Sequence, residues 1–247
     1  MTEAALASRN AASSTRPLLD VQELNGWYGE SHVLHGISFN VMPGEVVTLL
    51  GRNGAGKTST LKAVMGILPR RSGSVMFDGA ETVSLQPRLI ARRGIAYCPE
   101  ERGIFSSLSV EENLMLPPQI REGGMSVERI FELFPNLKER LTSQGTKLSG
   151  GEQQMLSIGR ILRTGSKMLL LDEPTEGLAP VIIQQIGRTI AQLKREGFTI
   201  VLVEQNFRFA SSVADRHYVV EQGKVVDMIP NAELDANIDK LHAYLGV

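Results

Sequence analysis

One eight-residue stretch limits the folds open to this chain of 247 residues more than any other part of it. It reads Gly51-Arg-Asn-Gly-Ala-Gly-Lys-Thr58 and matches the pattern G-x-x-x-x-G-K-[ST] at every fixed position. An apolar run, Val46 to Leu50, leads into it, and a helix-permitting stretch, Ser59 to Met65, follows it. A glycine-rich turn before a helix is the plain alternative. The order of strand, loop and helix instead favours a loop that holds the phosphates of a nucleotide.

The residue types in this loop suit phosphate chemistry. Gly51, Gly54 and Gly56 would allow turns with positive φ, in which successive N–H groups point at an anion. The following helix would direct its positive end at the phosphates. Lys57 would bring a cation to the β and γ phosphates, and the Thr58 hydroxyl would be a ligand for Mg²⁺. The predicted phosphate-binding set is Gly51, Arg52, Asn53, Gly54, Ala55, Gly56, Lys57, Thr58 and Ser59.

A second motif, Leu148-Ser-Gly-Gly-Glu-Gln-Gln154, predicts the start of a helix that ends near Gly165. Ser149, followed three residues later by Glu152, forms a capping-box pattern. With two glycines directly after the cap, the helix N-terminus would be uncovered, and its N–H groups would be free to hold an anion. A plain helix start is the alternative, but it would need the serine without the two glycines.

A third motif places two carboxylates at the end of a strand. Met168 to Leu171 is wholly apolar, as a central parallel strand should be, and it stops at Asp172-Glu173-Pro174. Ligands bind at the carboxyl ends of strands in open α/β sheets. We therefore expect Asp172 to hold Mg²⁺ and Glu173 to polarise an attacking water. An acidic turn without function is the alternative, and it is a poor explanation after a phosphate loop.

The remaining strands are predicted from period-two patterns and short apolar runs. Leu18 to Glu23 and Ile37 to Val41 read as half-buried strands, with Trp27-Tyr28-Gly29 in a loop between them. Tyr28 could stack on a flat base or cover the edge of the sheet, and the residues alone leave both open. Thr199 to Val203 is the last strand able to reach the phosphates, and it ends in Glu204-Gln205-Asn206.

The middle and the end of the chain have other patterns. Ile95 to Cys98 reads as a buried strand, while Val110 to Leu116 and Val127 to Arg140 read as helices. We assign roughly residues 85–165 to a helical insertion into an α/β core. Residues 219–228 predict a closing hairpin, followed by a short amphipathic end helix.

Composition excludes several classes of protein. Hydrophobic residues make up 42% of the chain, which is enough for a full core, and the net charge of -1 gives no electrostatic footprint for nucleic acid. The single cysteine, Cys98, excludes an internal disulfide framework and fits a reducing compartment. No apolar run approaches the ~20 residues of a membrane span. Residues 1–17 read as a disordered extension, with a targeting peptide as the weaker alternative.

Phosphate loop, LSGGE and LLLDEP, in that order within one domain, resemble the pattern of ABC-type ATPases from about Leu18 to the end of the chain. The resemblance implies an α/β fold of the P-loop NTPase type over residues 18–247, with an antiparallel β subdomain and a helical subdomain. More narrowly, the chain is similar to ATP-binding subunits of branched-chain amino acid importers and their urea and amide relatives. The features that carry this similarity are Tyr28-Gly29, GRNGAGKTSTLK, CPEERGIF with SVEENL, LSGGEQQMLSIGRIL, LDEPTEGLAP and VLVEQNF.

The resemblance also implies roles for single residues. Tyr28 takes the position that stacks on adenine, and Glu100 takes the place of a glutamine that touches Mg²⁺ and the attacking water. Gln205 stands at the position of the switch histidine and would act in catalysis beside Lys57 and Glu173. The signature residues would contact the γ-phosphate bound to the opposite subunit; they are Ser149, Gly150, Gly151 and Glu152. The implied metal set is Thr58, Glu100 and Asp172.

Three departures from the family pattern affect the expected rate. Glu100 adds a negative charge near a polyanion. Gln205 can donate a hydrogen bond to the γ-phosphate but cannot carry a proton as an imidazole can. The segment after Pro174 reads Thr-Glu-Gly-Leu-Ala179, without the usual aspartate near its end. These departures are compatible with a slower site or one that depends on a partner.

The resemblance implies a motor that uses ATP and Mg²⁺ at the cytoplasmic face of the inner membrane, as a peripheral subunit. Its partners would be two integral membrane permease subunits, an extracytoplasmic solute-binding protein and a second, related ATPase chain, with a homodimer in isolation and no nucleic acid. One alternative is the motor of a lipid or lipopolysaccharide exporter. A soluble ABC ATPase of DNA repair or translation is disfavoured, because the chain has neither a long coiled-coil insertion nor tandem domains. A subunit that only binds nucleotide would fit Gln205, but Glu173 argues against it.

Overall fold

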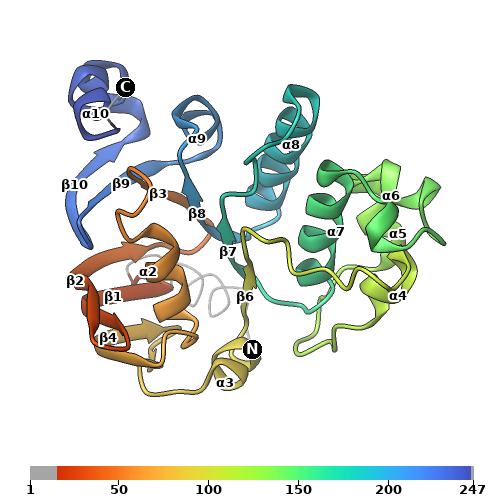
Figure 1. The fold of residues 1–247 in the computed structure, drawn as a ribbon, viewed down its shortest axis with the longest axis horizontal. Helices are drawn as coiled ribbons and strands as arrows, with labels where there is room; N and C mark the ends of the chain where they lie inside the picture. Colours follow the sequence, from red (N-terminus) through yellow and green to blue (C-terminus); the bar gives the residue numbers. More distant parts are fainter. Residues whose placement is uncertain (1–15, 246–247) are drawn as a thin grey trace, which may run out of the picture.

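The computed structural model describes residues 16–245, which form two β-sheets and the helices around them (Figure 1). The larger sheet has six strands in the order β10-β9-β3-β8-β7-β6. Every pair in it is parallel except the hairpin β9–β10. Its strands are β3 (Val46–Leu50), β6 (Ile95–Cys98), β7 (Met168–Asp172), β8 (Thr199–Glu204), β9 (Arg216–Glu221) and β10 (Lys224–Pro230).

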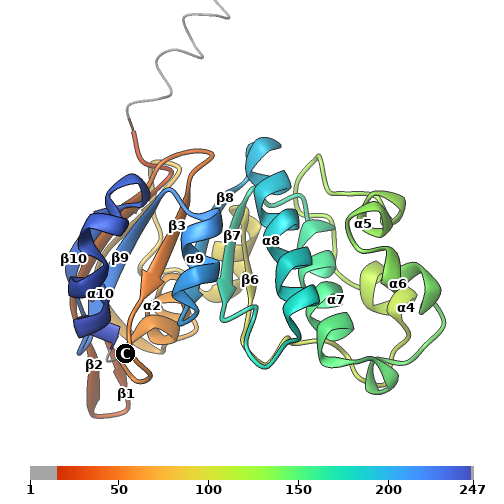
Figure 2. The same cartoon turned by 90° about the horizontal axis from the view of Figure 1, so that it is seen from above.

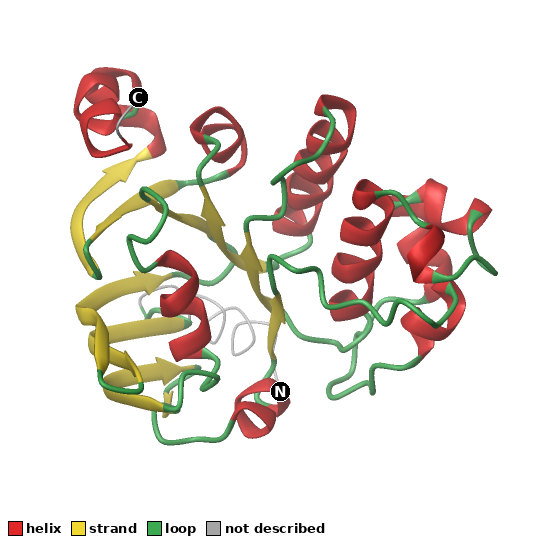
Figure 3. Cartoon of the chain, in the orientation of Figure 1, coloured by secondary structure: helices red, strands yellow, loops and turns green. Residues whose placement is uncertain are grey.

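The three central strands form because their residues are apolar on both faces. Every residue of β3, β7 and β8 is buried, as expected for parallel strands covered on both sides. Figure 3 shows these strands between helices. The predicted buried strands and the predicted closing hairpin are therefore confirmed, with small differences at their ends.

The second sheet is antiparallel, in the order β2-β1-β4-β5. Its strands are β1 (Leu19–Tyr28), β2 (Ser31–Val41), β4 (Arg70–Phe77) and β5 (Ala80–Glu81). The prediction that Trp27 and Tyr28 lie in a loop was wrong, because β1 continues to Tyr28. Register shifts between Val21 and Leu24, and a positive φ of 48° at Glu23, interrupt the period-two pattern that the sequence shows up to that point.

Helices cover both faces of the six-stranded sheet. On one face, α2 (Lys57–Val64) and α3 (Pro87–Arg92) lie between this sheet and the antiparallel one, in a shared apolar core. On the other face pack α7 (Gly150–Leu162), α8 (Pro180–Arg195) and α9 (Phe207–Val213). The sheet thus presents the carboxyl ends of its parallel strands between two layers.

A small group of helices lies at the end of the molecule far from the antiparallel sheet (Figures 1 and 2). It contains α4 (Val110–Met115), α5 (Val127–Leu133) and α6 (Pro135–Glu139). The single helix predicted over 127–140 is broken at Phe134, whose φ of -133° and ψ of 72° leave the helical region before Pro135. The predicted insertion, 85–165, also begins too early. It includes α3 and β6, and β6 pairs with β7 in the central sheet.

The chain closes against the edge of the large sheet. After β10 come the short 3₁₀ turns Asn231–Glu233 and Asp235–Asn237, and then α10 (Ile238–Leu245); a further 3₁₀ turn, Gly145–Lys147, precedes α7. Leu241 of α10 is fully buried in a cluster with Leu50 and Val219. Among residues 16–245, no helix is long and apolar enough to cross a membrane. The extension predicted over residues 1–17 falls almost entirely on residues 1–15, which lie outside the described residues.

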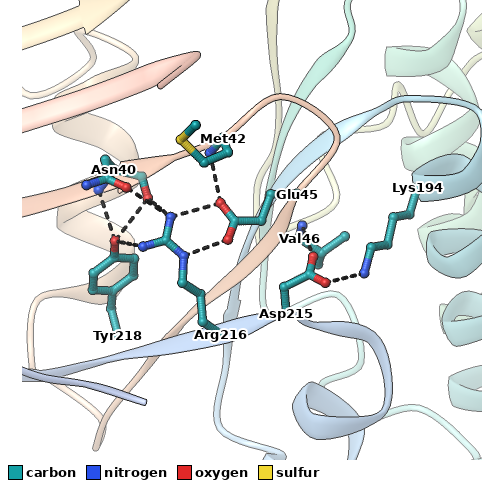
Figure 4. A network of polar contacts seen from close by, with 8 residues as sticks. All are labelled: Asn40, Met42, Glu45, Val46, Lys194, Asp215, Arg216 and Tyr218. Carbon is teal, nitrogen blue, oxygen red and sulfur yellow. Dashed lines mark hydrogen bonds and ion pairs between the residues drawn. The ribbon is translucent and has the colours of Figure 1, made fainter. Parts of the chain in front are cut away.

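The two sheets are joined by a polar network around Arg216, at the amino-terminal ends of β3 and β9 (Figure 4). Its guanidinium donates Nε to Glu45 Oε1 at 2.6 Å and Nη2 to Glu45 Oε2 at 2.8 Å, which is a bidentate ion pair. The same Nη2 reaches the carbonyl and side-chain oxygens of Asn40 on β2, each at 2.9 Å. Arg216 therefore ties the antiparallel sheet to the large sheet, at the end opposite the phosphate loop.

Candidate functional site

A cavity of about 320 Å³ opens at the carboxyl ends of β3, β7 and β8. Its wall combines the phosphate loop with the residues that follow β6, β7 and β8. It is lined by Val33, Asn53, Gly54, Gly56, Lys57, Thr58, Ser59, Glu100, Glu173, Glu176 and Gln205. The structure thus brings the predicted catalytic residues together with most of the predicted phosphate-binding ones. The other predicted site residues lie outside this wall: Gly51, Arg52, Ala55, Asp172, Tyr28 and the four signature residues.

The backbone of the loop explains its glycines in two different ways. Gly54 and Gly56 have φ of 79° and 105°, in the left-handed region, as predicted. Gly51 was predicted to need a positive φ as well, and this was wrong. A Cβ at Gly51 would instead lie 2.3 Å from the carbonyl oxygen of Val220 on β9. The hairpin β9–β10 also stabilises the loop directly, since Gly223 N–H donates to Ala55 O at 2.8 Å.

Lys57 points into the loop and is only 4% exposed. Its Nζ donates to Gly51 O at 2.8 Å and to Arg52 O at 3.2 Å, and it lies 3.5 Å from Glu173 Oε1. A buried ammonium needs acceptors on several sides. These carbonyl and carboxylate oxygens hold it where phosphate oxygens could replace some of them.

Asp172, at the end of β7, is held by two hydroxyl groups. Thr58 Oγ1 donates to its Oδ1 at 2.9 Å, and Tyr97 OH donates to its Oδ2 at 2.8 Å. Burial raises the pKa of the Asp172 carboxyl, and the two hydrogen bonds partly oppose this shift. Burial, followed by the nearby charge of Asp172, raises the pKa of Tyr97, so this phenol stays a donor. Tyr97 was not among the predicted site residues; its only signal was a hydroxyl in an otherwise apolar strand.

The oxygen atoms of Thr58 and Asp172 fit Mg²⁺, which prefers hard oxygen ligands and keeps several of its waters. Glu100 lines the same cavity, so a third oxygen ligand is within the same wall. Among residues 16–245, no three His, Cys, Asp or Glu side chains are grouped as a metal site of their own. A bound Mg²⁺ would share its coordination sphere with waters and with oxygens of the substrate, as is usual for this ion in proteins.

Glu173 and Gln205 face each other across the ends of β7 and β8. Glu173 has a φ of 45°, and its N–H donates to Val203 O at 3.0 Å. This left-handed turn lifts its side chain off the strand, so that Gln205 Nε2 can donate to Glu173 Oε2 at 2.8 Å. The pair predicted to act in catalysis is thus in direct contact, with Glu173 between an ammonium and an amide.

The cavity carries more negative than positive charge. Among the residues that the structure describes, three carboxylates line it, those of Glu100, Glu173 and Glu176, and Lys57 is the only cation in its wall. A hydrogen bond with the Glu173 side chain, followed by burial, raises the pKa of Glu176. Glu176 was not among the predicted site residues, although it lies within the predicted segment after Pro174. A polyanion would enter this cavity together with cations.

Glu204 is a third residue that the sequence prediction missed. Its carboxylate is 2% exposed. Oε1 accepts from the Thr175 N–H at 3.3 Å and from Thr175 Oγ1 at 2.7 Å, while Oε2 accepts from the N–H groups of Gln205 at 3.2 Å and Asn206 at 3.3 Å. Glu204 therefore joins the segment after Glu173 to the turn that carries Gln205. Burial raises the pKa of Glu204 to about 7, against the effect of these hydrogen bonds.

The signature segment begins α7 with the predicted capping box. Glu152 Oε2 accepts from Ser149 N–H at 2.7 Å, and Ser149 Oγ accepts from Glu152 N–H at 3.3 Å. The helix N-terminus is less uncovered than predicted. A Cβ at Gly151 would lie 3.0 Å from Ile182 on α8, and one at Gly150 would lie 3.2 Å from the Arg102 guanidinium. Both glycines thus also serve close packing.

Tyr28 ends β1 with 45% of its surface exposed. Its neighbour Trp27 is stacked on His32 at 4.4 Å between ring centroids, and the Arg70 guanidinium lies 4.8 Å from the Trp27 ring. Trp27 therefore has its ring engaged on the surface of the antiparallel sheet. The free ring of Tyr28 is compatible with stacking on a base, which stays a prediction.

The comparisons with known proteins agree with this arrangement. The family model described as ABC transporter matches residues 34–176, which include the phosphate loop, the signature segment and the acidic pair Asp172 and Glu173 at the end of β7. The chain belongs to the ABC transporter family. It is an ATPase of that family, which confirms the fold class and the enzyme class expected from its motifs.

Several relatives cover nearly the whole of this ABC ATPase. The high-affinity branched-chain amino acid transport ATP-binding protein BraG of Pseudomonas aeruginosa is 46% identical over 93% of the chain and 100% of its own length. The lipopolysaccharide export system ATP-binding protein LptB of Escherichia coli K12 is 36% identical over 92% and 97%. A probable branched-chain amino acid transport ATP-binding protein, LivF of Archaeoglobus fulgidus, is 34% identical over 84% and 90%.

Solved structures have the same fold. A nucleotide-free ATP-binding cassette from an ABC transporter superposes with a TM-score of 0.81 at 24% identity, over 94% of this chain and 99% of its own. An ATP-binding cassette, MJ0796, solved as a dimer in a post-hydrolysis state with ADP and phosphate, gives 0.76 at 22% identity, over 86% and 98%. At this identity the likeness concerns the fold alone.

Proposed function

We propose that this chain is the ATP-hydrolysing motor of an ABC importer that takes up branched-chain amino acids or related small polar solutes such as urea and amides. One observation carries the catalytic part: Lys57, Glu173 and Gln205, which follow three different strands, line one cavity beside the phosphate loop, and Asp172 is hydrogen-bonded to Thr58 in its wall. The similarity to BraG supports the class of solute.

In the proposed reaction the chain's own groups bind, orient and take up a proton. Lys57 leaves the carbonyl oxygens of Gly51 and Arg52 for phosphate oxygens of ATP. Glu173, at the cavity wall, accepts the proton of the attacking water, and the Gln205 amide orients Glu173 through the hydrogen bond of 2.8 Å. Thr58, Asp172 and Glu100 would hold Mg²⁺, which supplies positive charge to the phosphate oxygens.

The proposal includes a second ATPase subunit. The signature residues lie outside the cavity of their own chain, so they are available to the nucleotide of another chain. That second chain is either a related ATPase or a second copy, and each signature helix contacts the γ-phosphate held by the opposite phosphate loop. The complex further contains two membrane permeases and an extracytoplasmic solute-binding protein, with this chain on the cytoplasmic face of the inner membrane. ATP favours the closed form through contacts that the open form lacks.

Steady-state ATP hydrolysis tests the catalytic roles. The Glu173→Gln variant should lose about 100-fold or more of kcat, because the amide cannot accept the proton, while its ATP affinity stays close to that of the wild type. Gln205→His should keep or raise kcat, because imidazole can also donate to the γ-phosphate. Full activity in Glu173→Gln would remove Glu173 from the proposed role.

Lipopolysaccharide export is the second candidate, because LptB is 36% identical over 92% of the chain. The two candidates differ in the solute that depends on this chain. A strain that lacks the chain should lose the uptake of labelled leucine, or of urea or an amide, and should transport lipopolysaccharide normally. Normal uptake of all three solute classes, together with a defect in lipopolysaccharide transport, would favour the exporter.

A further inference from the structure

The segment after β6, residues 99–103, is held by one polar face of α7. Gln153, Ser157 and Arg160 are spaced four and three residues apart, so they lie on the same side of the helix. The Ser157 hydroxyl donates to Arg102 O, and the Arg160 guanidinium donates to Gly103 O. This segment begins one residue before Glu100, which lines the nucleotide cavity.

The Arg102 side chain reaches back to the start of α7. Its Nη1 donates to Gln153 Oε1 at 3.0 Å, and its Nη2 would lie 3.2 Å from a Cβ at Gly150. Its backbone is in the left-handed region, with φ of 65°, which is unfavourable for a residue that has a Cβ. Within residues 16–245, no carboxylate forms an ion pair with Arg102. The guanidinium is therefore directed at the signature helix rather than at an acidic partner.

Gln153 extends this connection to the residues just before Ser149. Its Nε2 donates to Gly145 O at 3.1 Å and to Leu148 O at 3.3 Å, while its Oε1 accepts from Arg102. These three hydrogen bonds fix the orientation of the Gln153 amide, with its oxygen directed toward Arg102 and its nitrogen toward Gly145 and Leu148. The chain of contacts runs from the Glu100 segment through Arg102 and Gln153 to the signature residues.

We propose that Arg102 is a positioning residue that fixes the start of the signature helix relative to Glu100. The inference rests on the proposed function, in which Glu100 serves the chain's own nucleotide and Ser149 serves the nucleotide of the opposite subunit. Through Arg102, a displacement of Glu100 at one nucleotide moves the signature residues that contact the other. Arg102 itself touches neither substrate nor metal.

A purely structural role would give a different pattern of effects. If Arg102 only stabilised the fold, its loss would lower the thermal stability and the ATP affinity together and would not affect the closing of the dimer separately. If it positions the signature helix, ATP binding to a single chain should persist, because the phosphate loop is unchanged. Dimer closure and kcat should fall, because both need the signature residues in place.

The test compares the wild type with Arg102→Ala, Arg102→Lys, Gln153→Ala and the double variant Arg102→Ala/Gln153→Ala. Arg129→Ala is the matched control, since Arg129 is a half-exposed arginine of α5 that forms ion pairs with Glu132 and Glu196 and does not line the cavity. The measurements are kcat and KM for ATP with Mg²⁺, the ATP affinity of the single chain, and ATP-dependent dimerisation by light scattering in a Glu173→Gln background.

We expect Arg102→Ala to lower kcat about tenfold, with KM changed by less than about twofold. Dimerisation should weaken, Arg102→Lys should recover part of kcat, and Arg129→Ala should match the wild type. Because Arg102 and Gln153 form one shared contact, the kcat of the double variant should be at most about twofold lower than that of Arg102→Ala. Should Arg102→Ala fail to fold, Arg102→Gln replaces it in the same comparison.

Three results would overturn the inference. The first is an unchanged kcat in Arg102→Ala, and the second is a fall in its kcat matched by an equal loss of ATP affinity. The third is a fall in kcat of the double variant equal to the product of the falls in the two single variants. A failure of the proposed function looks different. In that case the wild type would not hydrolyse ATP, or Glu173→Gln would hydrolyse it as fast as the wild type.

Discussion

Glu204 shows at the scale of one residue how burial and hydrogen bonding compete for a carboxyl group. Four donors surround its two oxygens, which favours the charged form, yet the side chain is 2% exposed and the pKa is raised to about 7. Loss of solvation therefore outweighs the hydrogen bonds. The carboxyl group takes up a proton in the folded chain at a pH where the unfolded chain has already lost it.

This difference predicts how stability depends on pH. Between the ordinary pKa of 4.5 and the folded value of about 7, the folded chain binds the extra proton. Raising the pH through this window therefore lowers the contribution of Glu204 to the free energy of unfolding, by roughly 3 kcal/mol. Chemical denaturation of the wild type and of Glu204→Gln should show it. The stability advantage of the wild type over the variant should shrink as the pH rises from about 5 to about 8, whereas a constant difference would contradict the assignment.

The sequence predicts single residues well where a motif fixes their spacing. Lys57, Thr58, Asp172 and Glu173 all follow from local patterns, and the structure brings them together. Tyr97 escaped prediction because its role depends on the pairing of β6 with β7, where Tyr97 lies opposite Leu170, two residues before Asp172. Glu204 escaped for a similar reason, because its partner Thr175 is distant in sequence.

At the scale of elements, the phosphate loop depends on the hairpin β9–β10. The close approach of Gly51 to Val220 O leaves no room for a Cβ, and the obstacle is backbone, which cannot rotate away. The loop is therefore shaped by a hairpin about 170 residues later in the chain as well as by its own glycines.

Replacing Gly51 should separate steric crowding from backbone strain. Gly51→Ala should cost about 1–3 kcal/mol of stability through overpacking and should weaken ATP binding, because the loop must shift. Gly44→Ala is the matched control. Its φ of 76° makes the backbone unfavourable, but nothing lies within 4 Å of its Cβ position. The control should lose about 1 kcal/mol and keep its ATP affinity, as measured by denaturation and by equilibrium titration. Equal ATP affinity in both variants would contradict the crowding argument.

Elements were predictable where one periodicity ran without interruption. The buried strands β3, β7 and β8 are continuous apolar runs, and the structure confirms them. β1 was predicted too short because its bulge near Glu23 shifts the alternation of faces. The helix over 127–140 was predicted too long because the apolar spacing continues across Pro135, although the backbone does not.

At the scale of the whole molecule, Arg216 joins the two sheets from a position far from the nucleotide cavity. The hydrogen bonds to Glu45 raise the pKa of Arg216 more than any other cause does. The side chains of Arg216 and Glu45 are only about 15% exposed. A charge pair with so little access to water is costly to leave half-satisfied.

Arg216→Ala should therefore lower the free energy of unfolding by about 3 kcal/mol, because Glu45 would stay buried without its partner. The double variant Arg216→Ala/Glu45→Ala should lose less free energy of unfolding than the two single variants lose in sum. Denaturant unfolding measures both, and Arg129→Ala, which removes a half-exposed arginine with surface ion pairs, should cost less than about 1 kcal/mol. KM for ATP should stay within about twofold, since the network lies at the opposite end of the strands. A raised KM for ATP with an unchanged free energy of unfolding would show that the network serves the cavity instead.

The order of three motifs in one domain was enough to predict the fold and the ATPase family, and the match over residues 34–176 confirms both. The boundary of the helical subdomain could not be derived in the same way, because β6 joins the central sheet through pairing with a strand that follows about 70 residues later. The permeases, the solute-binding protein and the Mg²⁺ ligands stay predictions, since they depend on surfaces and groups supplied by other molecules.

The position of β3 has a consequence for the folding of the nascent chain during its synthesis on the ribosome. Among the described strands, β3 forms ladder hydrogen bonds only with β8 and β9, and Ala55 O of the loop that follows it accepts a hydrogen bond from Gly223 N–H. These partners are synthesised about 150 to 170 residues after β3, which at usual elongation rates is on the order of 10–30 s later. For that interval the nascent chain carries a complete nucleotide motif without the strands that support it, so the capacity to hold ATP arises only after β8, β9 and Gly223 have been synthesised.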